Sequence, residues 1–311
     1  MNTIANRQVI CNTLIELAKT DKDIMVLTCD SRGSASMGNF AKEYPKQFVE
    51  VGIAEQDSVG IAAGLATCGK KPYVASPACF LSMRSVEQIK VDVAYSKTNV
   101  KLIGISGGVS YGALGMTHHS LQDIAVIRAI PDIAVLLPAD RFETKKMIEA
   151  LNDYDGPAYI RIGRNPVEDI YENEDFNFEI GKGNIIHEGN DITVIATGET
   201  VKPALDASKE LESKGIGCRV ISMHTIKPLD EEIIIKAAKE TKAIITIEEH
   251  SIYGGLGAAV SEVVCQKALV KMKILGIADE APITGNSKEV FNYYGLTSEN
   301  LVNIAEEILK K

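Results

Sequence analysis

The stretch FVEVGIAEQDSVGIAAGLATCGKKPYVASPACF, residues 48–80, contains a short apolar run, a small-residue helix pattern that ends at Gly69, and a second apolar run. The same alternation of strand and helix patterns continues along the whole chain. Alternation of this kind is typical of parallel sheets covered by helices. The sequence therefore predicts an α/β protein with two doubly wound domains, each built on a mostly parallel sheet.

The length of the chain, 311 residues, also favours two domains, because one compact core is usually smaller. An acidic, polar and aperiodic segment over residues 171–184 has the composition of a surface linker. We predict a first domain over residues 1–168, a linker over 169–184, and a second domain over 185–311 with about four strands and five helices. In such folds ligands bind beyond the carboxyl ends of the strands.

Composition excludes several functional classes. The net charge of −9 argues against general binding to nucleic acid or anionic membrane, because such binding requires a surplus of Lys and Arg. The six cysteines form no CxxC pair and no zinc-type spacing, so we expect reduced thiols and no metal site within the chain. No apolar run approaches the length of a bilayer span, and no secretory segment is apparent. We therefore expect a cytoplasmic protein.

Glu55 stands among small residues that extend from Gly52 to Gly64. One interpretation is an acid in the first turn of a helix, where it interacts with the helix dipole and free amide groups. Another is a desolvated carboxyl that hydrogen-bonds a partner, which the small neighbours would allow to approach closely. The small neighbours shift the balance toward the second interpretation.

Residues 107–120, GGVSYGALGMTHHS, form a glycine-rich loop after a predicted strand. In one interpretation a histidine of this loop caps a helix that begins near Ser120. In the other, His118 or His119 transfers protons or hydrogen-bonds hydroxyl groups. Metal binding is disfavoured, because adjacent histidines point apart and no carboxylate or cysteine stands at a ligand spacing.

Guanidinium groups follow the last predicted strand of the first domain at Arg161 and Arg164, and Arg7 lies near the start of the first helix. Such groups suit phosphate by bidentate geometry, but they suit salt bridges between domains equally well. The sequence does not rank these two interpretations.

The stretch EEHSIYGGLGAAV, residues 248–260, superficially resembles a dinucleotide-binding fingerprint. Its spacing is GGxG, however, and not GxGxxG. A tight turn with close helix packing is the favoured interpretation.

Five motifs, taken in order, resemble the C-terminal half of transketolase. They are VEVGIAEQDSVGIAAGLA, KPYVASPACFL, GGVSYGALGMTHHSLQDIAVIRAIPDIAVLLPAD, AYIRIGR and TIKPLDEEIIIKAAKETKAIITIEEHSIYGGLGAAVSEVV. The resemblance covers nearly the whole chain and implies a thiamine-diphosphate-binding fold, with a pyrimidine-binding domain followed by the transketolase C-terminal domain. It also implies a transferase that moves a ketol (glycolaldehyde) unit between a ketose phosphate and an aldose phosphate, as in the pentose phosphate part of carbohydrate metabolism.

The resemblance assigns cofactor contacts to individual residues. Glu55 matches the catalytic acid that hydrogen-bonds a ring nitrogen of the aminopyrimidine of thiamine diphosphate, and Phe80 matches the aromatic residue that lies against that ring. Asp30, at the end of the first strand, and Met83 match positions beside the cofactor. His118 matches a catalytic histidine that hydrogen-bonds a substrate hydroxyl.

For the sugar phosphate, the resemblance assigns Arg164, Arg7 and Ser34 to phosphate binding. The chain departs from the family at Leu114, where an Asp that hydrogen-bonds sugar hydroxyls is common, and at Ser106, where a phosphate-side histidine is frequent. Met116 likewise replaces a common Pro. Loss of the hydroxyl-binding Asp would weaken the binding of ordinary ketose donors by about 1.5–3 kcal/mol. We therefore expect an atypical sugar at these positions: branched, deoxy or otherwise modified.

In this family a Gly-Asp-Gly motif followed by an Asn binds the diphosphate and a divalent metal such as Mg²⁺, on a domain that precedes these two. No Gly-Asp-Gly occurs in the 311 residues. The resemblance therefore implies a split enzyme, in which a separate N-terminal subunit shares the cofactor within an α2β2 heterotetramer.

Two other functions remain open from the sequence. The beta subunit of a 2-oxo-acid dehydrogenase complex shares the two-domain layout, although the THHS and TIKPLD segments fit transketolase better. A non-catalytic scaffold homologue is the other, although the presence of Glu55, Phe80, His118 and Arg164 argues against it.

Overall fold

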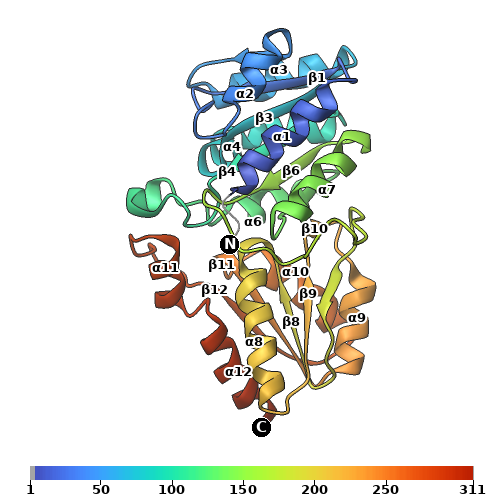
Figure 1. The fold of residues 1–311 in the computed structure, drawn as a ribbon, viewed down its shortest axis with the longest axis vertical. Helices are drawn as coiled ribbons and strands as arrows, with labels where there is room; N and C mark the ends of the chain where they lie inside the picture. Colours follow the sequence, from blue (N-terminus) through green and yellow to red (C-terminus); the bar gives the residue numbers. More distant parts are fainter. Residues whose placement is uncertain (1–3, 311) are drawn as a thin grey trace.

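The computed structural model describes residues 4–310 as two α/β units that lie one above the other, the first blue to green and the second yellow to red in Figure 1. The first sheet has the strand order β10-β5-β6-β4-β3-β1-β2, and the second has the order β12-β11-β8-β9-β7. All pairings are parallel except β10 with β5 and β7 with β9. The predicted fold class, α/β with two mostly parallel sheets, is confirmed.

The elements of the first unit are α1 (Asn6–Ala18), β1 (Ile24–Thr28), α2 (Gly38–Glu43), β2 (Phe48–Glu50), α3 (Glu55–Thr67), β3 (Lys71–Pro77), α4 (Ala78–Arg84), α5 (Val86–Gln88), the π-helix η2 (Ile89–Tyr95), β4 (Lys101–Ile105), the 3-10 helix η3 (Gly112–Thr117), α6 (Asp123–Arg128), β5 (Ala134–Leu136), α7 (Arg141–Asp153) and β6 (Ala158–Arg161). Those of the second unit are β7 (Asn184–His187), β8 (Ile192–Ala196), the 3-10 helix η4 (Gly198–Thr200), α8 (Val201–Ser213), β9 (Cys218–Ser222), β10 (Thr225–Lys227), α9 (Glu231–Glu240), β11 (Ala243–Ser251), α10 (Leu256–Lys267), β12 (Lys271–Ile277), α11 (Ser287–Tyr294) and α12 (Ser298–Lys310). None of these helices is long and apolar enough to cross a membrane.

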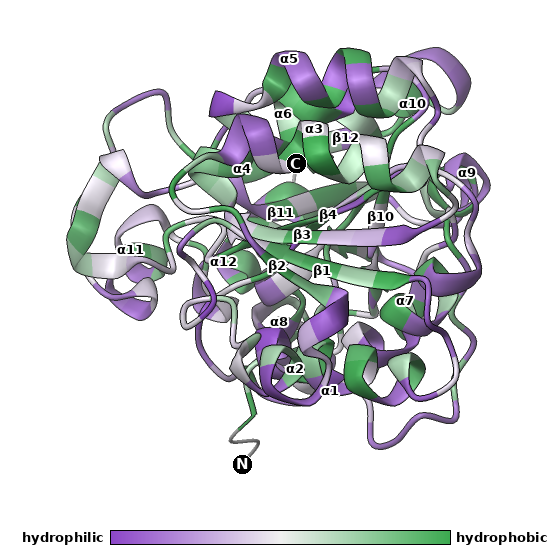
Figure 2. Ribbon diagram, turned by 90° about the horizontal axis from the view of Figure 1, so that it is seen from above, coloured by the Kyte–Doolittle hydropathy of each residue, from purple (hydrophilic) through white to green (hydrophobic). Residues whose placement is uncertain are grey.

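Each sheet is buried between two layers of helices. Helices α1, α2 and α7 cover one face of the first sheet, and α3, α4, η2 and α6 cover the other. The apolar side chains on this second face also contact α9 and α10 of the second unit, so that a single buried cluster includes residues from Leu27 to Val264. Helices α8 and α12 cover the remaining face of the second sheet. In Figure 2 the hydrophobic colour accordingly runs along β1, a strand inside the first sheet.

Two short strands were missed by the sequence analysis. The run CRVISMHTI, residues 218–226, contains β9 of the second sheet and the start of β10, which pairs antiparallel with β5 of the first sheet. The edge strand β7 was missed because it has only four residues, all of them half-buried, and shows no alternation. Strand β10 has a structural consequence, because a strand from the second unit thereby completes the first sheet.

Two helices also differ from expectation. The helix expected near Ser120 begins at Asp123, and the helical segment that follows Ser85 becomes a π-helix over Ile89–Tyr95. The segment that follows the first unit is fastened to it, because the amides of Ile170 and Tyr171 both donate to Asp140 Oδ2, at 2.7 and 2.9 Å.

The EEHSIYGGLGAAV stretch forms the expected tight turn with close packing. The Glu248 carboxylate accepts hydrogen bonds from the amides of Leu256 and Gly257, at 2.7 and 2.8 Å, and so caps α10. A Cβ atom at Gly257 would lie 2.5 Å from a methyl carbon of Ile274, which explains the glycine.

Arg161, the last residue of β6, joins the two units. Its side chain is almost fully buried, with Nε 3.3 Å from Asp123 Oδ2 and Nη2 3.7 Å from Glu249 Oε2 of the second unit. Burial alone would lower the pKa of Arg161, but the charges of Asp123 and Glu249 raise it above its ordinary value. Of the two interpretations that the sequence left open for Arg161, the structure supports the salt bridge between units.

Candidate active site

Glu55 is the first residue of α3, and only 4% of its surface is exposed. Its Oε2 atom lies 3.0 Å from Arg84 Nη1 at the end of α4. A pocket of about 340 Å³ opens beside this pair and is lined by residues 53–57 and Arg84. Both features expected from the sequence are present, since the acid stands in the first turn of a helix and it is desolvated and paired.

Aromatic rings connect this pair to the glycine-rich loop. The guanidinium of Arg84 lies 4.1 Å from the ring centre of Phe80, which is one helical turn earlier on α4. The His118 ring packs edge-on between Phe80 and Tyr111, at centroid distances of 5.2 and 5.3 Å. The side chains that the resemblance assigned to cofactor and substrate therefore meet at Phe80 and His118.

Beyond Tyr111, this series of contacting side chains ends at two cations, Arg164 and Arg7. The Arg164 guanidinium lies 5.2 Å from the Tyr111 ring centre, and Arg7 Nη1 donates to the Ser34 carbonyl at 2.6 Å. Burial and the nearby charge of Arg164 lower the pKa of Arg7. Within residues 4–310 neither guanidinium forms an ion pair with a carboxylate. Uncompensated cations at the carboxyl edge of a parallel sheet are suited to an anionic ligand.

We call this continuous set the active-site row. It consists of Glu55, Arg84, Phe80, His118, Tyr111, Arg164, Arg7 and Ser34.

The adjacent histidines of the loop have different roles. His118 belongs to the active-site row, and its Nδ1 lies 2.9 Å from Thr117 Oγ1. His119 is buried, and its Nε2 lies 3.1 Å from the Gly112 carbonyl oxygen, which ties the loop to itself. Burial lowers the pKa of His119. Neither ring caps α6, so the structure does not support the interpretation in which a histidine of this loop caps that helix.

The remaining predicted site residues are outside the active-site row, three of them at the surface and one in the interior. Asp30 is exposed after β1 in a left-handed conformation (φ 52°), and its amide donates to Glu50 Oε1 at 2.7 Å. Met83, next to Arg84, is half exposed, as is Leu114 in η3. Ser106 is not brought to this surface, because it is buried after β4 and its hydroxyl has no hydrogen-bond partner within the described chain.

Sequence reasoning did not single out Arg84 or assign a role to Tyr111. For Arg84 a signal existed, because its spacing of four residues from Phe80 places both side chains on one face of a short helix. In residues 4–310 no group of three or more His, Cys, Asp or Glu side chains is arranged to hold a metal ion.

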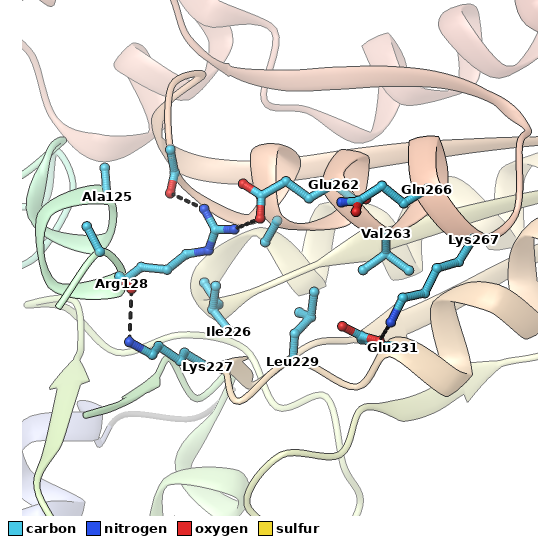
Figure 3. A pocket seen from close by; sticks show the side chains of 13 residues that line it. Ala125, Arg128, Ile226, Lys227, Leu229, Glu231, Glu262, Val263, Gln266 and Lys267 are labelled. Atoms are coloured by element: carbon cyan, nitrogen blue, oxygen red, sulfur yellow. Dashed lines mark hydrogen bonds and ion pairs between the residues drawn. The ribbon is translucent and has the colours of Figure 1, made fainter. Parts of the chain in front are cut away.

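A second, larger cavity lies elsewhere, at the junction of the units. It measures about 680 Å³ and lies between α6, β10 and α10 (Figure 3). Its charged side chains are paired with one another or with backbone: Arg128 with Glu262, Lys267 with Glu231, and Lys227 with the Arg128 carbonyl. None of the predicted site residues lines it.

Comparison with known proteins identifies the family. The model "Transketolase, pyrimidine binding domain" matches residues 2–168, and "Transketolase, C-terminal domain" matches residues 181–301. The chain belongs to the transketolase family. The resemblance to the C-terminal half of transketolase, drawn from the five sequence motifs, is thereby confirmed.

Several transketolase relatives match this chain end to end. One of the subunits of an apulose-4-phosphate transketolase from Phocaeicola vulgatus is 54% identical over 100% of this chain and 99% of its own length. A 6-deoxy-6-sulfo-D-fructose transketolase subunit from a Clostridium species is 36% identical over 98% of this chain and 94% of its own. A solved split-gene transketolase, described as an inactive β4 tetramer, superposes with a TM-score of 0.90 at 36% identity and covers 99% of both chains.

Longer transketolase chains share the fold over part of their length. The transketolase of Campylobacter jejuni superposes with a TM-score of 0.81 at 22% identity, and this chain spans 47% of it.

We predict that Arg164→Gln weakens anion binding without destabilising the fold. The substitution removes a charge that opposes Arg7, so the free energy of unfolding should change by less than about 0.5 kcal/mol, whereas affinity for inorganic phosphate should fall about tenfold. Urea unfolding and calorimetric titration with phosphate measure the two effects. Lys145→Gln, which removes an exposed cation paired with Glu174, is the matched control. A loss of stability above about 1 kcal/mol would instead give Arg164 a structural role.

Proposed function

We propose that this chain is the C-terminal subunit of a two-subunit transketolase, which uses thiamine diphosphate to transfer a ketol unit from a ketose phosphate to an aldose phosphate. The observation that carries the proposal is the active-site row, which places a buried carboxylate at one end and a pair of uncompensated cations at the other. Its centre is a histidine between aromatic rings. Cofactor, sugar hydroxyls and phosphate can each be assigned to one part of this row.

The residues around Glu55 suit the aminopyrimidine ring of the cofactor. Glu55 is buried, yet Ile53, Met83 and Arg84 beside it are exposed, so a flat ring can lie on this surface with its edge toward the carboxyl. A hydrogen bond between a shielded carboxyl and a weakly basic ring nitrogen is strong, because water does not compete for either group. Phe80 and Met83 would contact the face of the ring, and Asp30 would lie nearby.

The other residues of the row would hold the substrate. When bound, thiamine diphosphate supplies the nucleophilic carbon of the reaction. Glu55 would hold a proton at the ring nitrogen, and His118, with Nδ1 at the Thr117 hydroxyl, would use Nε2 to hydrogen-bond a sugar hydroxyl. Arg164, Arg7 and Ser34 would hold the phosphate group.

A partner subunit is part of the proposal. Large apolar side chains are exposed just before α3 and on the helices packed with it. They are Ile53 before α3, Ile61 on α3, Met83 on α4, and Val91 and Tyr95 on the π-helix. Exposed apolar surface of this kind is typical of protein interfaces. We propose that a separate N-terminal subunit covers it and holds the diphosphate with a divalent metal such as Mg²⁺, within an α2β2 heterotetramer in the cytoplasm. The relative from Phocaeicola vulgatus is itself named as one subunit of its enzyme, which supports this arrangement.

We further propose an atypical sugar phosphate, branched, deoxy or otherwise modified. Leu114 and Met116 are each 53% exposed in the loop that carries His118. Leu114 stands where the family commonly has an Asp, and Met116 where it commonly has a Pro. Two of the relatives are named for unusual sugars, apulose 4-phosphate and 6-deoxy-6-sulfo-D-fructose. The same two relatives are named as transketolase subunits, which argues against the alternative function as beta subunit of a 2-oxo-acid dehydrogenase.

The function is tested by reconstitution. We predict that the purified chain alone catalyses no ketol transfer, and that adding the N-terminal subunit, thiamine diphosphate and Mg²⁺ restores it, because the diphosphate site is carried by the partner. A coupled assay of the products measures activity in both preparations. Robust activity of the chain alone would contradict the two-subunit proposal, and oxidative turnover with a lipoyl carrier would support the dehydrogenase alternative.

Glu55→Gln tests the catalytic assignment. The amide preserves size and burial but cannot hold a proton at a ring nitrogen, so kcat should fall by at least about 100-fold while the thermal unfolding temperature changes little. Glu16→Gln, which alters an exposed acid on α1, is the matched control and should retain full turnover. Near-normal rates with Glu55→Gln would show that the assignment is wrong.

Leu114→Asp tests the sugar. We predict poor turnover of xylulose 5-phosphate with ribose 5-phosphate by the wild-type complex, and a gain of about 10–100-fold in kcat/KM for this pair in the variant, since one charge-assisted hydrogen bond is restored. Leu269→Asp places the same change at an exposed leucine of the second unit and serves as the control. Full turnover of the ordinary sugars by the wild-type complex would remove the atypical-sugar proposal.

A further inference from the structure

The loop over residues 107–120, which carries Tyr111, Leu114 and His118, closes on itself at a narrow neck. The amide of Gly108 donates to the Ser120 carbonyl at 3.1 Å, and the amide of Ser120 donates to the Gly108 carbonyl at 2.8 Å. The eleven residues between Gly108 and Ser120 are therefore enclosed by one two-residue bridge, whose orientation affects their position. Whatever holds this neck also places the side chains at the tip.

Both sides of the neck are held by the end of β11 in the second unit. Glu249 Oε1 accepts a hydrogen bond from the Val109 amide at 2.8 Å, and the Ser251 amide donates to the Leu121 carbonyl at 3.0 Å. Arg161 Nη2 links the two contacts, because it donates to the Glu249 carbonyl at 2.6 Å and to the Ser120 carbonyl at 3.3 Å.

The backbone of the neck is shaped for this carboxylate. Gly108 has a φ of +59°, and a Cβ atom there would lie 2.1 Å from the carboxyl carbon of Glu249. A side chain at this position would displace the acid. The tip also rests on the second unit, since a Cβ atom at Gly115 would lie 2.9 Å from Thr284 Oγ1 and one at Gly112 would lie 3.3 Å from the Gly285 carbonyl oxygen.

We propose that Glu249 is a positioning residue, which from the second unit sets the affinity of the active-site row for its sugar phosphate without touching it. Glu249 is 4% exposed, and its carboxylate contacts the neck of the loop, while Tyr111 and His118 stand in the row. The second unit thereby acts on substrate binding through the loop. The kinetic part of this inference rests on the proposed transketolase function, and the structural part does not.

Glu248 provides a matched control for burial and charge. It is the adjacent residue, it is fully buried, and it also accepts hydrogen bonds from backbone amides, but those amides belong to α10 of the second unit. Glu248→Ala should therefore destabilise the protein about as much as Glu249→Ala and leave the loop in place. A merely structural role for Glu249 predicts the same kinetic behaviour for both variants.

The kinetic experiment uses the complete two-subunit enzyme. For Glu249→Ala we expect KM for the sugar phosphate to rise about tenfold, with kcat within about threefold of wild type, because one buried acceptor of a loop amide is lost. Glu249→Gln should recover most of the affinity, since its amide oxygen still accepts from Val109. Thiamine diphosphate affinity, measured by calorimetric titration, should not change. An unchanged KM for Glu249→Ala, or an equal rise for Glu248→Ala, overturns the proposal.

Hydrogen exchange on the isolated chain gives a second readout that needs no activity. We expect Glu249→Ala to accelerate exchange of the Val109 amide about tenfold or more, and Glu248→Ala to accelerate exchange at Leu256 and Gly257 instead. Equal protection of Val109 in both variants overturns the proposal. If the wild-type complex transfers no ketol unit, the proposed function fails, and the exchange result alone decides whether Glu249 holds the loop.

Discussion

The buried guanidinium of Arg161 is the constraint on which the arrangement of the two units depends. It lies between Asp123 of its own unit and Glu249 of the other, with almost no access to water. Taking such charges out of water is costly, and removal of one partner of a buried pair typically costs about 3–5 kcal/mol. The units therefore cannot separate or rotate without exposing an unpaired charge in a low-dielectric interior. The shared sheet pairing of β10 with β5 acts in the same direction.

The junction between the units contains more carboxyl groups than cations, and this makes the stability of the protein depend on pH. Burial raises the pKa of Glu249 and also that of Glu199, whose Oε1 is shielded from water and has no hydrogen-bond partner among the described residues. Arg161 alone cannot neutralise Asp123 and both of these carboxyls, so the folded junction retains protons that the unfolded chain would release at neutral pH. By linkage, the contribution of these two carboxyls to the free energy of unfolding is greatest below their pKa in the unfolded chain. It is lost as the pH rises through their raised pKa values in the folded protein.

The alternation of patterns in the sequence was sufficient for the fold class, because it reflects local helix and strand periodicity. Strands β7 and β10 could not be predicted from the sequence, because each is too short to show a periodic pattern. In addition, β10 forms by pairing with β5, a strand some ninety residues earlier in the chain. The role of Arg161 could not be decided, since a guanidinium after a strand looks the same in sequence whether it faces a ligand or another unit. Glu249 was overlooked for a related reason, because its hydrogen bond to Val109 spans 140 positions. Arg84 differs, because its spacing from Phe80 was a local signal.

The charges of the active-site row are arranged in a way that costs the ligand-free chain some stability. The like charges of Arg7 and Arg164 repel each other in the free chain, and the proposed phosphate group would relieve this repulsion. A buried acid needs a counter-charge, which Arg84 supplies to Glu55. In the proposed function, a ring nitrogen of the cofactor would compete with the Arg84 guanidinium for Oε2 of Glu55, or would use the other oxygen, Oε1. Because Arg84 is half exposed, its guanidinium can move into solvent at a small cost in free energy. The guanidinium also contacts the ring of Phe80, which is an interaction independent of Glu55. The Glu55 carboxylate is thus paired in the free chain, and a movement of Arg84 would open it to the proposed cofactor.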